Sequence, residues 1–174
     1  MNITGHVQSG SVQKRAPAGR SAAGFSLVEL LITLVLLGIV LAIAVPSYRG
    51  WVDNSNLKGA GRMISSDFYD TRARAMAENR AYTITYSPEP ANTCRIQAAA
   101  VNDLAAVDET KTFGEYGTVR MTAVNGGAAA VTVTIQPRGS AAPAATIGLT
   151  NVRNSTGTVT VLMRGRAHVT YSMQ

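Results

Sequence analysis

An apolar run between Gly24 and Val45 constrains this chain more than any other feature. It reads GFSLVELLITLVLLGIVLAIAV and contains a single charged side chain, Glu29. An α-helix rises about 1.5 Å per residue, and about 20 apolar residues cross the hydrocarbon core of a bilayer. The run is therefore long enough to span a membrane. A carboxylate within such a segment costs roughly 2.5 kcal/mol or more, so Glu29 either lies at headgroup level near the helix start or has a functional partner.

The residues before the run carry positive charge and no acid. Lys14, Arg15 and Arg20 give this stretch a charge of +3. A secretory signal has a shorter apolar region, which ends in a small-residue cleavage site. Here the run ends in P-S-Y-R at positions 46–49, and the small residue, Gly24, precedes it. This arrangement does not fit a conventional secretory signal.

The residues around Gly24 resemble the type IV prepilin signature, which pilins share with the pseudopilins of type II secretion. They read G-F-S-L-V-E-L, with an acid five residues after the glycine and an unbroken apolar run behind it. The resemblance implies that a membrane-embedded prepilin peptidase cleaves between Gly24 and Phe25 and that Phe25 is then N-methylated. Glu29 would pair with the new α-amino group of Phe25 on a neighbouring subunit and set the axial register of a filament.

A second helical segment is predicted after the apolar run. Pro46 is expected to kink the helix rather than end it, because helical signals resume directly. Apolar residues recur there at steps of three and four, at Leu57, Ala60, Ile64, Phe68 and Ala75. This spacing predicts one buried face, with Gly59 and Gly61 weakening the helix locally. A single helix from about Ser26 to Arg80 would lie in lipid with its first half and pack on a globular domain with its second.

From Ala81 the pattern changes to the alternation of period two that is typical of strands. Strands are predicted at 82–86, 93–101, 112–121, 129–136, 145–150, 157–164 and 167–172, with an acidic loop at 102–110 and turns at 124–127 and 137–140. The expected fold class is α+β and pilin-like, with a long N-terminal helix packed on an antiparallel β-sheet C-terminal domain. The expected parts are a removed basic leader (1–24), a transmembrane assembly helix (25–46), an amphipathic helix half (47–80) and a β-rich periplasmic domain (81–174).

Three further segments resemble the GspH/FimT group of minor pilins and minor pseudopilins. They read RAMAENRAYTIT at 74–85, IQPRG at 135–139 and VLMRGRAHV at 161–169. The group commonly ends in a strand–turn–strand with G-R-x-R at the turn, and here Gly165 and Arg166 are followed by His168 in place of the second arginine. Arg164 is expected to compensate. In FimT-like pilins of transformable bacteria this turn is implicated in binding DNA, so the resemblance implies the same role here.

Positive charge collects in the last third of the chain. Residues 25–115 carry a net charge of −2, whereas residues 116–174 hold five arginines and no acid. Guanidinium groups bind phosphate in a bidentate manner, so Arg153, Arg164 and Arg166 predict salt-dependent, sequence-independent contact with double-stranded DNA. Tyr171 is the only ring expected nearby, which disfavours single-strand stacking. In the alternative interpretation, Gly165 only shapes a hairpin and the arginines stay solvated or contact a neighbouring subunit.

Catalysis, cofactors and a metal site are not expected. Cys94 is the only cysteine and is expected to be a buried thiol, and His168 is the single histidine after the leader. Two hypotheses remain open. One is a FimT-like minor pilin that joins or primes a type IV pilus and binds DNA for natural transformation. The other is a GspH-like minor pseudopilin of type II secretion. Both place the chain as a single-pass protein of the bacterial inner membrane, with the C-terminal domain in the periplasm, and then in the pilus or pseudopilus.

Overall fold

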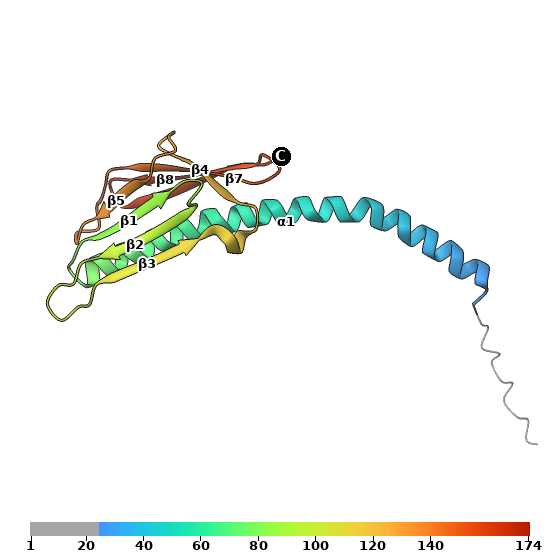
Figure 1. The fold of residues 1–174 in the computed structure, drawn as a ribbon, viewed down its shortest axis with the longest axis horizontal. Helices are drawn as coiled ribbons and strands as arrows, with labels where there is room; N and C mark the ends of the chain where they lie inside the picture. The colour runs from blue at the N-terminus through green and yellow to red at the C-terminus, as the bar shows by residue number, and fades with distance from the viewer. Residues whose placement is uncertain (1–24) are drawn as a thin grey trace, which may run out of the picture. The chain divides into compact units, whose positions relative to one another are not determined.

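One long helix opens the fold. The computed structural model describes residues 25–174, and its first element is α1, Leu27–Ala77, which continues through Pro46 (Figure 1). The chain divides into an N-terminal part up to Val40 and a compact unit from Leu41 to Gln174. Asn79 ends the helical path with a φ of 49°. The prediction of a single helix between about Ser26 and Arg80 is confirmed.

Nine strands and a short 3-10 helix follow α1 in the compact unit. Their bounds are β1 Tyr82–Ser87, β2 Thr93–Ala98, β3 Val107–Thr112, η1 Phe113–Tyr116, β4 Arg120–Val124, β5 Val131–Ile135, β6 Ala141–Ala142, β7 Ala145–Thr150, β8 Thr156–Leu162 and β9 Arg166–Ser172. All the pairings are antiparallel. The strands form a five-stranded sheet in the order β3-β2-β1-β5-β6 and a four-stranded sheet in the order β4-β7-β8-β9. The fold class is confirmed, with two sheets where a single sheet was expected.

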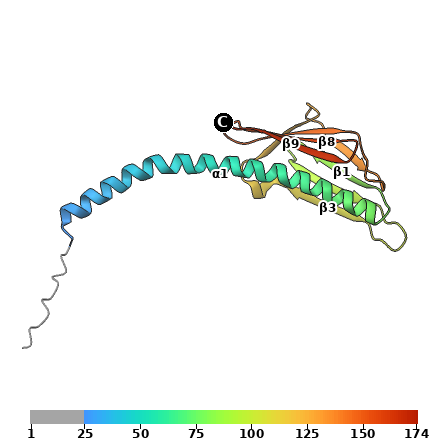
Figure 2. The same cartoon turned by 180° about the vertical axis from the view of Figure 1, so that it is seen from behind.

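The core lies between the second half of α1 and the inner faces of both sheets. The five helix residues that the periodicity selected, Leu57 to Ala75, are fully buried. Along β1 and β8 buried positions alternate with partly exposed ones, which is the pattern of strands with one covered face. Figure 2 shows this half of α1 lying between β3 and β9, the edge strands of the two sheets. Burial of a side chain the size of Phe68 stabilises such a core by roughly 2–3 kcal/mol.

Two sequence predictions are wrong between residues 102 and 121. The expected acidic loop contains β3, which pairs with β2 along its length. Its carboxylates are compatible with a strand because Asp108 bonds Arg95 of β2 and Glu109 bonds Arg74 of α1. The expected strand at 112–121 begins instead with η1, whose Phe113 is buried, and regular pairing resumes only at β4.

The glycines Gly59 and Gly61 have a packing role that sequence reasoning missed. A Cβ added at Gly59 would lie 2.7 Å from the Tyr116 ring, and one added at Gly61 would lie 2.6 Å from the Tyr171 hydroxyl. The Tyr171 hydroxyl donates to the Lys58 carbonyl oxygen. These glycines lower the helix propensity locally, but they allow α1 to pack closely against two aromatic rings.

Candidate assembly segment and basic turn

Within residues 25–174, no other element covers the apolar part of α1. Its most apolar 18-residue window has a mean hydropathy of 2.9, and none of that window is buried. Large side chains from Leu27 to Val45 are at least 44% exposed, and Phe25 is 82% exposed. A surface of this size and polarity needs a lipid bilayer or other apolar helices around it. Among residues 25–174, one helix is long and apolar enough to cross a membrane.

Glu29 lies in the first turn of α1. The helix begins at Leu27, and the first regular backbone bond runs from the Leu30 N–H to the Ser26 carbonyl oxygen at 3.1 Å. Unpaired N–H groups and the helix dipole favour a negative side chain at this position. Phe25 lies four residues before Glu29 and immediately outside the helix, whereas Gly24 lies outside the described residues. The Glu29 carboxylate therefore lies in the N-terminal turn of the apolar segment.

The C-terminal basic turn joins β8 to β9. Gly165 adopts a φ of 74° and is buried, and its N–H donates to the Leu162 carbonyl oxygen at 2.9 Å. This left-handed conformation favours glycine. Arg164 and Arg166 flank the turn with exposed side chains. The glycine therefore fixes the backbone while both guanidinium groups remain accessible.

A second turn, at residues 137–140, packs directly against the first. The Ala141 N–H donates to the Met163 carbonyl oxygen at 3.0 Å, and a Cβ added at Gly165 would overlap the Gly139 carbonyl oxygen. Gly139 itself has a φ of 80°. The Arg72 Nε of α1 donates to the same Gly139 oxygen at 2.7 Å. Three segments that are distant in sequence therefore meet at two glycines.

This contact extends the candidate site beyond the predicted residues. Arg138 is exposed on the second turn, and Arg72 reaches the site from α1. Sequence reasoning noted the P-R-G turn without assigning Arg138 a role. Nothing in the local pattern of α1 distinguished Arg72 from the other helix arginines. We use the name basic turn cluster for Arg72, Arg138, Arg164 and Arg166.

No carboxylate among residues 25–174 forms an ion pair with a member of the basic turn cluster. The five ion pairs within residues 25–174 use Arg74, Arg80, Arg95, Lys111 and Arg120. No member of the cluster belongs to one of these pairs. The four guanidinium groups thus present a positive surface that is suited to an anionic partner.

The structure separates the predicted DNA-binding residues into two places. His168 is exposed on β9 opposite Thr160, close in sequence to the basic turn. Arg153 lies in the loop before β8, at the other end of that strand, and its guanidinium covers Gly50 of α1. Gly50 and Arg72 are 22 residues apart on one helix, which is about 33 Å at the standard rise. Arg153 therefore does not join the basic turn cluster.

Two tyrosines, Tyr69 of α1 and Tyr171 of β9, hold β9 against α1. The Tyr69 hydroxyl donates to the Ala167 carbonyl oxygen and accepts from the Ala167 N–H, both at 3.1 Å. Tyr69 is 43% exposed, so it is a ring beside the basic turn that the sequence did not indicate. The expectation that Tyr171 is the only nearby ring is therefore wrong. A single ring fixed by two hydrogen bonds does not provide the successive stacking platforms of single-strand binders.

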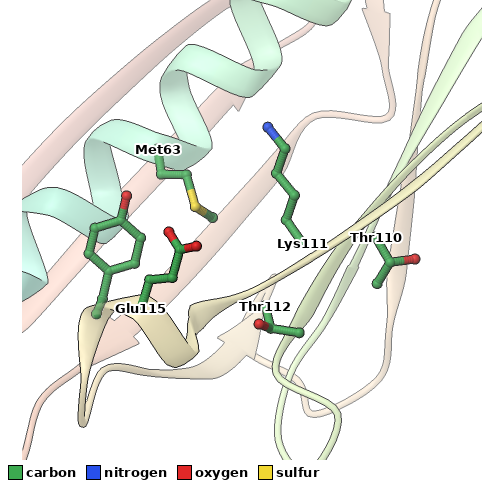
Figure 3. A pocket seen from close by; sticks show the side chains of 6 residues that line it. Met63, Thr110, Lys111, Thr112 and Glu115 are labelled. Carbon is green, nitrogen blue, oxygen red and sulfur yellow. The ribbon is translucent and has the colours of Figure 1, made fainter.

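A cavity of about 410 Å³ lies between α1 and the segment from β3 to η1. Figure 3 shows Met63 of α1 and Glu115 of η1 pointing toward one another across it. Lys111, which also lines the cavity, bonds the buried Asp67 carboxylate at 2.5 Å. The residues from 25 onward contain no group of three His, Cys, Asp or Glu side chains that could hold a metal ion.

Cys94 lies in the core on β2, as predicted, and is fully buried. Burial, assisted by the Asp67 carboxylate, raises the pKa of the Cys94 thiol to about 12. A thiol held in its protonated form is a poor nucleophile. Cys94 therefore acts as a small apolar core residue.

Comparisons with known proteins agree with these features. A model of the prokaryotic N-terminal methylation motif matches residues 19–45. The fimbrial protein EcpC of Eikenella corrodens is 33% identical over 87 residues, which cover 45% of this chain and 57% of the length of that relative.

Two solved structures share the fold at low sequence identity. The minor pseudopilin EpsH from the type 2 secretion system of Vibrio cholerae aligns with a TM-score of 0.53 at 9% identity, covering 67% of this chain and 97% of that one. The type IV minor pilin FimU of Pseudomonas aeruginosa (strain PAO1) aligns with a TM-score of 0.51 at 12% identity, covering 69% and 92%. The chain therefore combines a prokaryotic N-terminal methylation motif with a pilin-like fold, which it shares with the minor pseudopilin EpsH and the minor pilin FimU.

Proposed function

We propose that this chain is a FimT-like minor subunit of a type IV pilus, held in the bacterial inner membrane by residues 25–46 until it enters the filament. The observation that carries the proposal is the uncovered apolar helix with Glu29 in its first turn, inside the segment that matches the N-terminal methylation motif. In the membrane, lipid covers the helix. In a filament, the helices of other pilins cover it, and Glu29 pairs with the methylated α-amino group of Phe25 on a neighbour.

The orientation follows from the charges that flank the apolar run. The leader carries three cations and no acid. Positive flanks remain on the cytoplasmic side of a membrane-spanning helix. The C-terminal domain then lies in the periplasm, where the prepilin peptidase leaves it after cleavage between Gly24 and Phe25.

Processing and assembly are tested separately in cells. Mass spectrometry of the membrane-bound protein is expected to find a chain that begins with N-methylated Phe25. Glu29→Ala is expected to be cleaved normally but to be absent from sheared filaments. Thr33→Val is the matched control, because the Thr33 hydroxyl already donates to the Leu30 carbonyl oxygen within its own helix. Normal incorporation of the Glu29→Ala subunit would refute the pairing role.

The alternative function is that of a minor pseudopilin, which the fold shared with EpsH also supports. Deletion of the gene distinguishes the two. Loss of surface pili with unchanged protein export is expected for a pilus subunit. Loss of export with intact pili would assign the chain to type II secretion instead.

A second part of the proposal is that the basic turn cluster binds the phosphate backbone of double-stranded DNA. The exposed guanidinium groups of Arg138, Arg164 and Arg166 lie on two turns held together at Gly139 and Gly165. Such contacts release counterions, and each neutralised phosphate contributes about −0.9 to the slope of log affinity against log salt. We therefore expect sequence-independent binding with a slope of roughly −3 to −4 for four contacts. His168 on the neighbouring strand adds a hydrogen-bonding group rather than a fixed charge.

The DNA proposal is tested by retardation of a 30-base-pair duplex by the full chain in detergent micelles. The double variant Arg164→Gln/Arg166→Gln is expected to weaken binding and to reduce the salt slope by about 2. Arg49→Gln/Arg153→Gln removes the same charge elsewhere and is expected to leave the DNA affinity and the salt slope nearly unchanged. Equal losses in the two variants would show that net charge, not the turn, drives retardation. No retardation by the unmodified chain would remove the DNA role.

A further inference from the structure

An exposed aromatic pair follows the apolar run on α1. Tyr48 and Trp51 are each 66% exposed, and their ring centroids lie 6.2 Å apart in a stacked arrangement. Arg49, between them in sequence, is exposed as well. Tyrosine and tryptophan combine an apolar ring with one polar group, and they gather where hydrocarbon meets water in membranes.

The position of the pair along the helix matches that boundary. The helical residues 27–45 span about 28 Å at the standard rise, close to the 30 Å hydrocarbon core of a bilayer. Tyr48 and Trp51 lie three and six residues further, which is about 4 and 9 Å beyond Val45. The headgroup zone extends over a comparable depth on each side of the core.

The loop before β8 brings a second cation to the same level of α1. A Cβ added at the buried Gly50 would lie 2.5 Å from Arg153 Nη1. The loop is held there because Asn151 Oδ1 accepts the N–H groups of Arg153 and Ser155, both at 3.0 Å. Asn151 Nδ2 in turn donates to Asn54 Oδ1 of α1 at 3.0 Å. The Arg153 guanidinium therefore lies against Gly50, at the same level along α1 as the aromatic pair.

From this arrangement we propose that Tyr48, Arg49, Trp51 and Arg153 form a collar that contacts phospholipid headgroups, with the rings at the hydrocarbon boundary and the two guanidinium groups on lipid phosphates. Within the described part of the chain, neither arginine belongs to an ion pair. Asp53, on the next turn, is the one carboxylate close in sequence, so the cations outnumber it. The collar rests on the proposed membrane anchoring and adds a lipid contact made by the folded domain, which explains why Arg153 lies apart from the basic turn cluster.

Trp51 is the single tryptophan of the chain, so its fluorescence reports on the collar alone. The full chain is reconstituted in phosphatidylcholine vesicles, and insertion is established first by resistance to alkaline carbonate extraction. Quenching is then compared among lipids brominated near the headgroup, lipids brominated near the acyl end, and aqueous acrylamide. We expect shallow bromines to quench at least twofold more than deep ones.

Brominated phosphatidylglycerol, diluted into the same vesicles, measures the preference for anionic headgroups beside Trp51. We expect a relative binding constant two- to fivefold above that of brominated phosphatidylcholine, falling toward one in Arg49→Gln/Arg153→Gln. The Arg164→Gln/Arg166→Gln variant is the matched control and should retain the preference. Circular dichroism verifies that each variant is folded.

The outcomes separate the collar from the anchoring on which it rests. A chain extracted by carbonate contradicts membrane anchoring itself. An inserted chain whose Trp51 is quenched as much by deep bromines, or mainly by acrylamide, overturns the collar. An interfacial Trp51 with an unchanged lipid preference in Arg49→Gln/Arg153→Gln overturns the role of the arginines. If Arg49→Gln/Arg153→Gln lost as much DNA retardation as Arg164→Gln/Arg166→Gln, Arg153 would belong to the DNA-binding surface. That result would also overturn the role of the arginines in lipid binding.

Discussion

Gly165→Ala tests the junction that brings the two basic turns together. Gly165 is buried at a φ of 74°, and its Cα faces the Gly139 carbonyl oxygen. A methyl group there would overlap that oxygen and would lie 2.5 Å from Arg72 Nε. The Gly139 carbonyl is part of the backbone, so one of the two turns must move. That movement removes the 2.7 Å bond from Arg72 Nε to the Gly139 oxygen.

The expected loss of stability has two parts. A non-glycine residue in the left-handed region costs about 1–2 kcal/mol. A hydrogen bond from a charged donor contributes about 1.5–3 kcal/mol. Together they predict a decrease in the free energy of unfolding of about 2.5–5 kcal/mol. Gly126→Ala is the matched control, because Gly126 has a φ of 76° and no atom within 4 Å of an added Cβ. That substitution is expected to cost only the conformational part, about 1–2 kcal/mol.

The assay is urea unfolding of residues 50–174, followed by circular dichroism. This fragment contains every buried residue of the described chain. The fragment should also lose affinity for duplex DNA on Gly165→Ala, since the two turns no longer present their arginines together. If Gly165→Ala is no more destabilising than Gly126→Ala, the two turns do not pack as described, and the basic turn cluster has no structural basis.

Four further substitutions test the core and its polar groups by the same unfolding assay. Phe68→Ala removes a fully buried ring of α1 and is expected to cost about 3–5 kcal/mol. Lys111→Met leaves the Asp67 carboxylate, only 6% exposed, without its partner and should cost about 3 kcal/mol. Arg95→Met breaks a solvent-exposed pair and should change stability little, so an effect equal to that of Lys111→Met would contradict the burial of Asp67. The pKa of the Cys94 thiol rises from about 8.5 in the unfolded chain to about 12 in the fold. The contribution of this pKa difference to the free energy of unfolding is thus complete below about pH 8.5 and is lost as the pH rises toward about 12. Cys94→Ala should therefore abolish that part of the loss of stability at alkaline pH.

The sequence alone determined the features that depend on local pattern. The apolar run, Glu29 in its first turn and the cations before it are properties of consecutive residues. The buried face of α1 from Leu57 to Ala75 follows from helical periodicity, since a helix repeats its faces every 3.6 residues. Most strands were predicted for the same reason, because alternation of period two is visible wherever one face is covered. Two strands were missed: exposed acidic side chains hide the alternation at β3, and the two-residue β6 is too short to show any.

Tertiary structure decided which distant residues meet. Arg72, Gly139 and Gly165 lie in three different segments. No local pattern shows that the Gly139 carbonyl oxygen meets both Arg72 and Gly165. Arg153 and Arg164 belong to one basic third of the sequence, yet β8 holds them at opposite ends of a sheet. Charge along a chain is additive, but binding depends on distances between side chains, and these are fixed only when the strands pair and pack on α1. For this reason composition predicted a basic surface, and only the fold divided it into the basic turn cluster and a separate arginine, Arg153, beside Gly50 of α1.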